Sequence, residues 1–266
     1  MRAGPSHLWD ALKEASSVVL LILGIMVLWE GAVLVFKPSP IILPAPSALW
    51  GEFLAAPSYF LRQALFTLYT TLAGFALAVV LGLALAVGIV HSRLMEKTVY
   101  TVLVALNSVP KVALAPLFVI WMGTGIEPKI AIALMLALFS VVIDAVLGLR
   151  SVDPDMISLA KASRASTFAI LRKIRLPNAL PSIFAGLKVA ISFALVGAIV
   201  GEFVAGSEGL GFAILTAQGQ FDTPRVFVCL ILLGLLGTAL FYVVEAIERL
   251  ALPWHVSQRS GRAAQH

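Results

Sequence analysis

The sequence predicts an all-α membrane protein with about six transmembrane helices, and three observations support this. The mean hydropathy is +1.00, 60% of the 266 residues are hydrophobic and only 12% are charged, which is more apolar surface than a water-soluble domain of this length buries. The apolar residues form windows of about 20 residues, the length that crosses a hydrocarbon core about 30 Å thick. No ten-residue alternation typical of barrel strands occurs, so helices are expected to satisfy the backbone in lipid.

The predicted spans follow one another along a single transmembrane domain, 1–266. Their approximate bounds are 16–36, 63–90, 98–123, 129–149, 178–205 and 226–248. We expect the first to be a retained helix and not a cleaved export signal, because Asp10 and Glu14 dilute its basic flank and no small-x-small cleavage site follows. Charged residues interrupt the third, fourth and fifth spans: Lys111, Asp144, Lys188 and Glu202.

Lys and Arg residues are distributed unequally between the two sides of these spans. Thirteen of the 19 lie on the side of the amino terminus, four lie on the other side and two lie within spans. Because cytoplasmic loops carry the excess of positive charge, we expect a multi-pass protein of the bacterial cytoplasmic (inner) membrane with both termini in the cytoplasm. Topology then explains the net charge of +5, and no nucleic-acid partner is expected.

The segment 150–177 is the largest predicted cytoplasmic loop. It is basic, and its apolar spacing predicts two short helices, one capped by Asp153 and the next by Ser166. We expect the second helix to end at Leu176, because Pro177 disfavours helical backbone in the residue before it. Such a pair suits docking into a groove on a partner protein or lying on anionic lipid headgroups, and the residues alone leave both open.

The stretch LAKASRASTFAILRKIRLPNALPSI, 159–183, resembles the cytoplasmic Glu-Ala-Ala loop of permease subunits of ATP-binding-cassette importers. In this alignment Leu159 and Ala160 stand at the Ala pair of the motif. Ser158 replaces its Glu, and Arg164 replaces its Gly. Four further stretches resemble the branch of the family that transports nitrate, sulfonates and taurine: ILPAPSALW (42–50), TLAGFALAVVLGLALAVGI (71–89), LNSVPKVALAPLFVIWMGTG (106–125) and GEFVAGSEGLGFAI (201–214).

The resemblance implies a type I importer permease fold in which 150–177 is a coupling-helix loop. It implies as partners cytoplasmic ATPase subunits that hold ATP and Mg, an extracytoplasmic solute-binding protein and a second permease subunit. The small-residue stripe of the fifth span favours a homodimer, and a heterodimer stays open. The residues that it places in coupling to the ATPase are Ser158, Leu159, Ala160, Arg164, Ala165, Phe168, Leu176 and Pro177. This chain contains no G-x-x-x-x-G-K-[ST] motif, so it is not expected to bind nucleotide or to be an enzyme itself.

Charges within the spans are the best internal indication of a translocation pathway, because a charge in lipid is costly and must face protein or water. Lys111 directly follows Pro110, and we expect both to line the pathway; a lysine that snorkels or is paired internally is an equal alternative. For Glu202, a position at the outer opening competes with an ordinarily solvated interfacial carboxylate. Asp144 and Lys188 are predicted to form a structural pair rather than a proton relay.

Small residues predict close helix packing in the fifth span, where Gly197 and Gly201 form a GxxxG pattern. The sequence does not identify the helix against which this pattern packs: packing within the chain and packing between subunits are both open. The four histidines are dispersed and the single cysteine lies in the last span, so no metal site and no cofactor of this chain are expected.

The function predicted is that of the permease subunit of an importer that forms the pathway for a small solute. The alternative is a secondary, ion-coupled transporter, for which broken helices and buried charges are also typical. Six helices are few for that class, and the basic loop would have no role in it. The sequence leaves the solute open among nitrate, sulfonates, taurine and small heterocyclic vitamin precursors.

Overall fold

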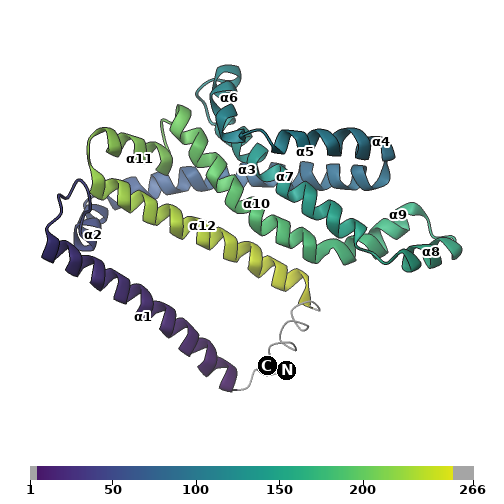
Figure 1. Cartoon of the computed structure of the whole chain (residues 1–266), viewed down its shortest axis with the longest axis horizontal. Coiled ribbons are helices and arrows are strands. Elements are labelled where there is room, and N and C mark those ends of the chain that lie inside the picture. Colours follow the sequence, from purple (N-terminus) through teal and green to yellow (C-terminus); the bar gives the residue numbers. More distant parts are fainter. Residues whose placement is uncertain (1–4, 254–266) are drawn as a thin grey trace. The chain divides into compact units, whose positions relative to one another are not determined.

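The computed structural model describes residues 5–253, which are almost entirely helical and contain no strand in that range. Helices α3 (Pro57–His91), α7 (Glu127–Arg150) and α12 (Thr223–Ala251) are long and apolar enough to cross a membrane, and so is the continuous helical stretch Thr167–Ala205. The predicted span 16–36 lies within α1 (Pro5–Phe36) (Figure 1). The described residues of 1–60 and 213–231 form one compact unit, and those of 61–212 and 232–266 form a second.

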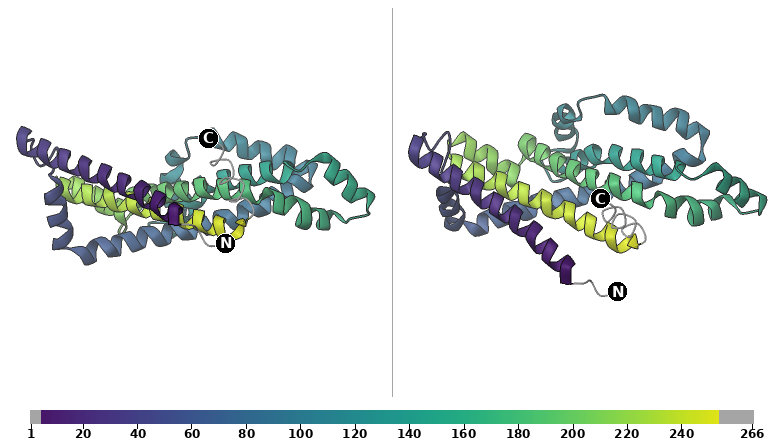
Figure 2. Two further views of the ribbon diagram at one scale, coloured as in Figure 1. Left: turned by 90° about the horizontal axis from the view of Figure 1, so that it is seen from below. Right: turned by 60° about the horizontal axis from the view of Figure 1, so that its bottom comes forward.

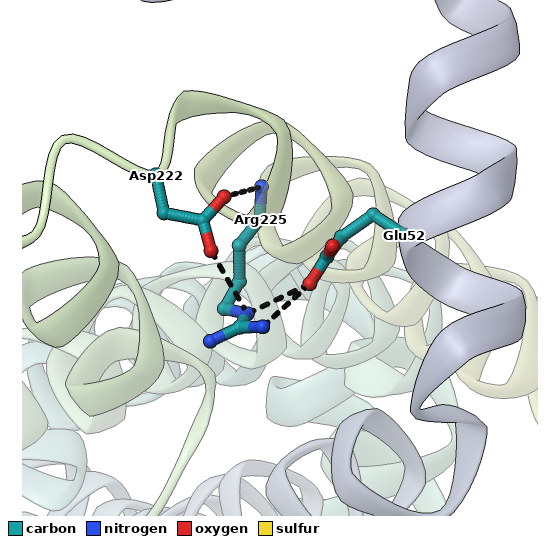
Figure 3. A network of polar contacts seen from close by, with 3 residues as sticks. All are labelled: Glu52, Asp222 and Arg225. Atoms are coloured by element: carbon teal, nitrogen blue, oxygen red, sulfur yellow. Dashed lines mark hydrogen bonds and ion pairs between the residues drawn. The ribbon is translucent and has the colours of Figure 1, made fainter.

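The first unit contains α1, α2 (Pro46–Ala55), the start of α3, most of α11 (Leu210–Gly219) and the first part of α12. Arg225, near the start of α12, connects these segments: its Nη2 lies 2.7 Å from Glu52 Oε1 on α2, and its Nε lies 3.3 Å from Asp222 Oδ2 (Figure 3). Glu30 of α1 accepts hydrogen bonds from the backbone N–H and the hydroxyl of Ser47. Within this unit, these contacts join α1 to α2 and α2 to the start of α12.

The second unit is built around α7 and α10 (Leu176–Ala205), which pack against each other in antiparallel directions (Figure 1). Gly201 faces Lys129, Gly197 faces Ala133, and a Cβ added to either glycine would lie 2.6 to 2.8 Å from the facing backbone. Small residues allow backbones this close, and in lipid such packing holds helices together. The GxxxG pattern is therefore used within the chain.

The predicted span 98–123 is not one helix. The chain runs through α4 (Arg93–Met95), the π-helix η1 (Glu96–Tyr100) and α5 (Thr101–Asn107), then bends by 92° before the 3-10 helix η2 (Lys111–Leu114) and α6 (Ala115–Met122) (Figure 2). The bend falls at 108–110. Pro110 has no N–H to donate and takes φ −66°, ψ 88°, so the helical hydrogen-bond ladder stops there.

Candidate functional site

The segment between α7 and α10 forms two short capped helices, as predicted. Asp153 accepts a hydrogen bond from the Asp155 N–H at the start of α8 (Pro154–Ala162), and Ser166 accepts one from the Ala169 N–H at the start of α9 (Thr167–Ile170). The ribbon places both helices beyond the ends of α7 and α10 (Figures 1 and 2). We call 150–177, with these helices, the coupling segment, after the role that the resemblance of its sequence implies.

Arg164 has a left-handed backbone with φ 58°. It follows α8 in a two-bond turn, in which Arg164 N–H donates to the Lys161 carbonyl and Ala165 N–H donates to the Ala160 carbonyl. This arrangement is the Schellman motif, whose left-handed position favours glycine. The left-handed backbone explains why the related loop motif has a glycine at this position. This chain has an arginine in the same conformation.

Several side chains of the coupling segment are exposed. Leu159 and Phe168 expose 69% and 68% of their surface, and the Arg164 side chain is also exposed. Ser158 is tied to its own helix, because its hydroxyl donates to the Pro154 carbonyl at 2.9 Å. The motif position normally held by Glu thus carries a short, internally bonded side chain, and the exposed surface is apolar and basic.

The second helix of the coupling segment was predicted to end at Leu176, and this prediction is wrong because the helix continues. Residues Leu171–Arg175 form the π-helix η3, and the Leu176 N–H donates to the Leu171 carbonyl, five residues back. This wider turn accommodates the ring of Pro177 at the start of α10, so the helix passes through both residues. The exposed pair Leu176 and Pro177 marks a continuous junction and not an angle between two helices.

A cavity of about 520 Å³ opens beside the bend in the broken span. It is formed by the bend itself, α7 and α10, and its polar wall consists of Asn107, Lys111, Ser140 and Asp144. Lys111 Nζ hydrogen bonds Asn107 Oδ1 and lies 5.0 Å from the centre of the Phe139 ring. Pro110 is exposed at the bend but does not line this cavity. Lys111 and Asp144, which the sequence treats separately, thus share one cavity.

The predicted pair of Asp144 and Lys188 is wrong. Lys188 Nζ lies 2.6 Å from Glu248 Oε2 on α12, and both side chains are largely buried. Asp144 packs against Gly186 of α10. Lys188 is two residues further along that helix, about 200° around its axis, so it faces α12 and not α7. Glu248, the last residue of the predicted span 226–248, was not expected to pair with a charge inside another span.

Glu202 is fully buried, so it neither guards an opening nor has ordinary solvation. Its carboxylate accepts hydrogen bonds from the Thr67 hydroxyl and the Gly211 N–H, both at 2.8 Å, and Thr67 Oγ1 in turn accepts the Leu210 N–H at 2.8 Å. The Gly209 N–H donates to Gln63 Oε1 at 2.6 Å. We call Gln63, Thr67 and Glu202, with the backbone of 209–211, the glutamate knot.

Two residues in this region, Gly209 of the glutamate knot and Lys129 of α7, have surroundings that tertiary packing determines. Gly209 has φ 111°, a conformation that other residues rarely adopt, and the Glu202 carboxylate occupies the place of a side chain there. Lys129 is 1% exposed and donates to the Gly125 and Ala205 carbonyls at 2.7 and 3.1 Å. From the sequence, Lys129 counts among the cations on the outer side, at the first residue of the predicted span 129–149. Its burial depends on the facing Gly201, which only tertiary packing reveals.

Comparisons with known proteins agree with this architecture. Residues 78–252 match the family described as binding-protein-dependent transport system inner membrane component. The chain is 36% identical over 251 residues to a riboflavin transport system permease protein of Chloroflexus aurantiacus, covering 94% of this chain and 92% of that one. It is 32% identical to a formylaminopyrimidine transport permease protein of Halalkalibacterium halodurans, covering 92% and 98%.

An aliphatic sulfonates transport permease of Escherichia coli, named as putative, is 30% identical and is covered to 89%. Among solved structures, an inward-facing methionine ABC transporter has a chain with TM-score 0.66 and 21% identity, covering 74% of this chain and 97% of that one. The methionine transporter structure shows the fold, and the sequence relatives show the family. This chain is a multi-pass permease subunit of an ATP-binding-cassette importer and belongs to the family of inner membrane components of binding-protein-dependent transport systems.

Proposed function

We propose that this permease imports a small heterocyclic vitamin or vitamin precursor and that its coupling segment binds the ATPase subunit. Relatives named for riboflavin and for formylaminopyrimidine match nearly the whole chain at 36% and 32% identity. The match to the sulfonate permease is weaker. These identities favour the heterocyclic class among the solutes that the sequence leaves open.

The observation that carries the coupling proposal is a pair of exposed apolar side chains, Leu159 on the short helix α8 and Phe168 in the first turn of the helical stretch Thr167–Ala205. Apolar side chains on helices of this size are typical anchors for a groove on a partner protein. Arg164 lies between them in the sequence, in a hydrogen-bonded turn, so an exposed charge belongs to the same short stretch of chain. A lipid headgroup surface would also accept these residues, but it would not require the fixed turn.

The test reconstitutes the chain with its ATPase and solute-binding subunits in liposomes and measures solute imported per ATP hydrolysed. Arg164→Glu is expected to lower this ratio at least tenfold or to reduce the ATPase that co-purifies, because the reversed charge opposes the docked surface. Lys97→Glu reverses an exposed charge outside the coupling segment and serves as the control. A ratio and a yield of ATPase equal to wild type in Arg164→Glu would contradict the proposal.

The proposed orientation places the coupling segment and both termini in the cytoplasm, with a second copy of this chain completing the permease pair. Cys229 is the sole cysteine and is fully buried, so a cysteine introduced at Lys161 is the accessible thiol. In intact cells a membrane-impermeant maleimide is expected to leave the Lys161→Cys variant unlabelled until the membrane is permeabilised. Labelling from outside the cell would overturn this orientation.

A further inference from the structure

We propose that the cavity beside the bend binds the solute within the permease and selects a planar nitrogen heterocycle that has N–H donors on one edge and an acceptor on another. The inference rests on the proposed function and assigns its selectivity to residues of this chain. The cavity lies entirely in the second unit, between the bend, α7 and α10. Its volume, about 520 Å³, falls in the range of roughly 300–1,000 Å³ typical of small-molecule sites.

The two charges in this cavity have no opposite partner in the part of the chain that the structure describes. Lys111 contacts an amide oxygen and a ring face, and it forms no ion pair with a carboxylate. Asp144 forms no ion pair with a cation in the described residues. By contrast, Lys188 lies in a close ion pair with Glu248.

A cation and a carboxylate left separate in one apolar cavity are complementary to a ligand with two different polar edges. A carboxylate accepts two N–H bonds side by side, such as those of a ring nitrogen and an adjacent amino group. An ammonium group donates to a carbonyl or ring nitrogen. A sulfonate or nitrate would satisfy Lys111 but would face the like charge of Asp144, so the cavity disfavours such anions.

The remaining walls suit a flat ring. Phe139 of α7 and Phe193 of α10 line the cavity together with aliphatic side chains. A phenyl ring can stack on a planar aromatic ligand, and an aliphatic side chain cannot. The bend is formed by non-helical backbone at 108–110. Irregular backbone inside a membrane span is tolerated where it is buried in protein or lines a cavity, and this one borders the site.

The experiment uses the complete reconstituted transporter with formylaminopyrimidine, riboflavin and an alkyl sulfonate as probes. Lys111→Met and Asp144→Asn are compared with Lys97→Met and Glu127→Gln, which neutralise exposed charges outside the cavity. We expect wild type and both controls to import a heterocyclic probe, and both cavity variants to show at least a tenfold higher KM. Equilibrium binding of that probe to the permease–ATPase complex without the binding protein is expected to weaken in parallel.

The outcomes separate this inference from the function on which it rests. Heterocycle import by all variants with the wild-type KM would overturn the assignment of the cavity and leave the proposed function intact. ATP-driven import of the sulfonate alone would overturn the ligand class. Failure of the chain to co-purify with an ATPase would overturn the proposed function itself. Retention of the wild-type KM by Lys111→Arg and Asp144→Glu would support a charge-based contact.

Discussion

Replacing Thr67 by Val tests whether the glutamate knot stabilises the helix packing. The two side chains have nearly the same shape, and Thr67 is fully buried, so the substitution removes hydrogen bonds without opening a cavity. It removes the donor to the Glu202 carboxylate and the acceptor of the Leu210 N–H, each at 2.8 Å. The first bond is to a charged group and contributes about 1.5–3 kcal/mol, and an unsatisfied N–H costs about 1–3 kcal/mol.

Hydrogen bonds between membrane helices tend toward the lower end of such values, so the expected loss of stability is about 3 kcal/mol. At about 2–4 °C per kcal/mol for chains of this size, Tm measured in detergent by intrinsic fluorescence is expected to fall by roughly 6–12 °C. Amide exchange at 209–211 is expected to accelerate in the same variant, because the backbone there loses its anchor.

Thr70→Val is the matched control. Thr70 is on the same helix and equally buried, but its hydroxyl bonds only the Phe66 and Thr67 carbonyls of its own helix, at 3.3 and 3.0 Å. Those carbonyls keep their helical partners, so the expected cost is below about 1 kcal/mol. If Thr67→Val and Thr70→Val lower Tm equally, the knot is not a stabilising contact and the reasoning fails.

Three further changes have expected outcomes. Arg164→Gly relieves a left-handed backbone and is expected to stabilise the protein by about 1 kcal/mol, seen as a higher Tm; a lower Tm would contradict the assigned turn. Glu248→Gln leaves the Lys188 charge without its buried partner and is expected to cost about 3–5 kcal/mol, and adding Lys188→Met should recover much of that loss in thermal unfolding. Gly201→Leu places a side chain against the facing backbone and is expected to prevent folding into a monodisperse detergent complex, whereas Gly24→Leu, with nothing within 4 Å of an added Cβ, should elute normally in size-exclusion chromatography.

The long apolar helices and the capped coupling segment could be predicted from the sequence because their signals are local. Hydropathy over about 20 residues identifies a span, and an Asp or Ser before an amphipathic run identifies a helix start. The caps at Asp153 and Ser166 have the expected hydrogen bonds. By the same local logic the bend at 108–110 was foreseeable from Pro110, although hydropathy alone joined its two halves into one span.

The errors arose where one residue's environment depends on a distant helix. Lys188 could not be matched to Glu248, 60 positions away, because the helical phase that turns it from α7 toward α12 is set by packing at Gly186. Glu202 looked like an exposed terminal carboxylate, since nothing in its neighbourhood along the chain shows that Thr67 covers it. At Pro177 the rule for residues before proline states a preference, and Leu176 takes the disfavoured helical backbone with φ −64° and ψ −48° directly after the π-helix η3.

The helical continuity through η3 has a mechanical consequence. The stretch Thr167–Ala205 has 39 residues, about 58 Å at 1.5 Å per residue, which is nearly twice the thickness of the hydrocarbon layer. One continuous helix therefore carries both the exposed phenyl ring of Phe168 in its first turn and the buried carboxylate of Glu202, three residues before its last residue, Ala205. A push or twist applied at the first end arrives at the second without passing through a joint, so both surfaces of the bilayer sense a single displacement at the same moment.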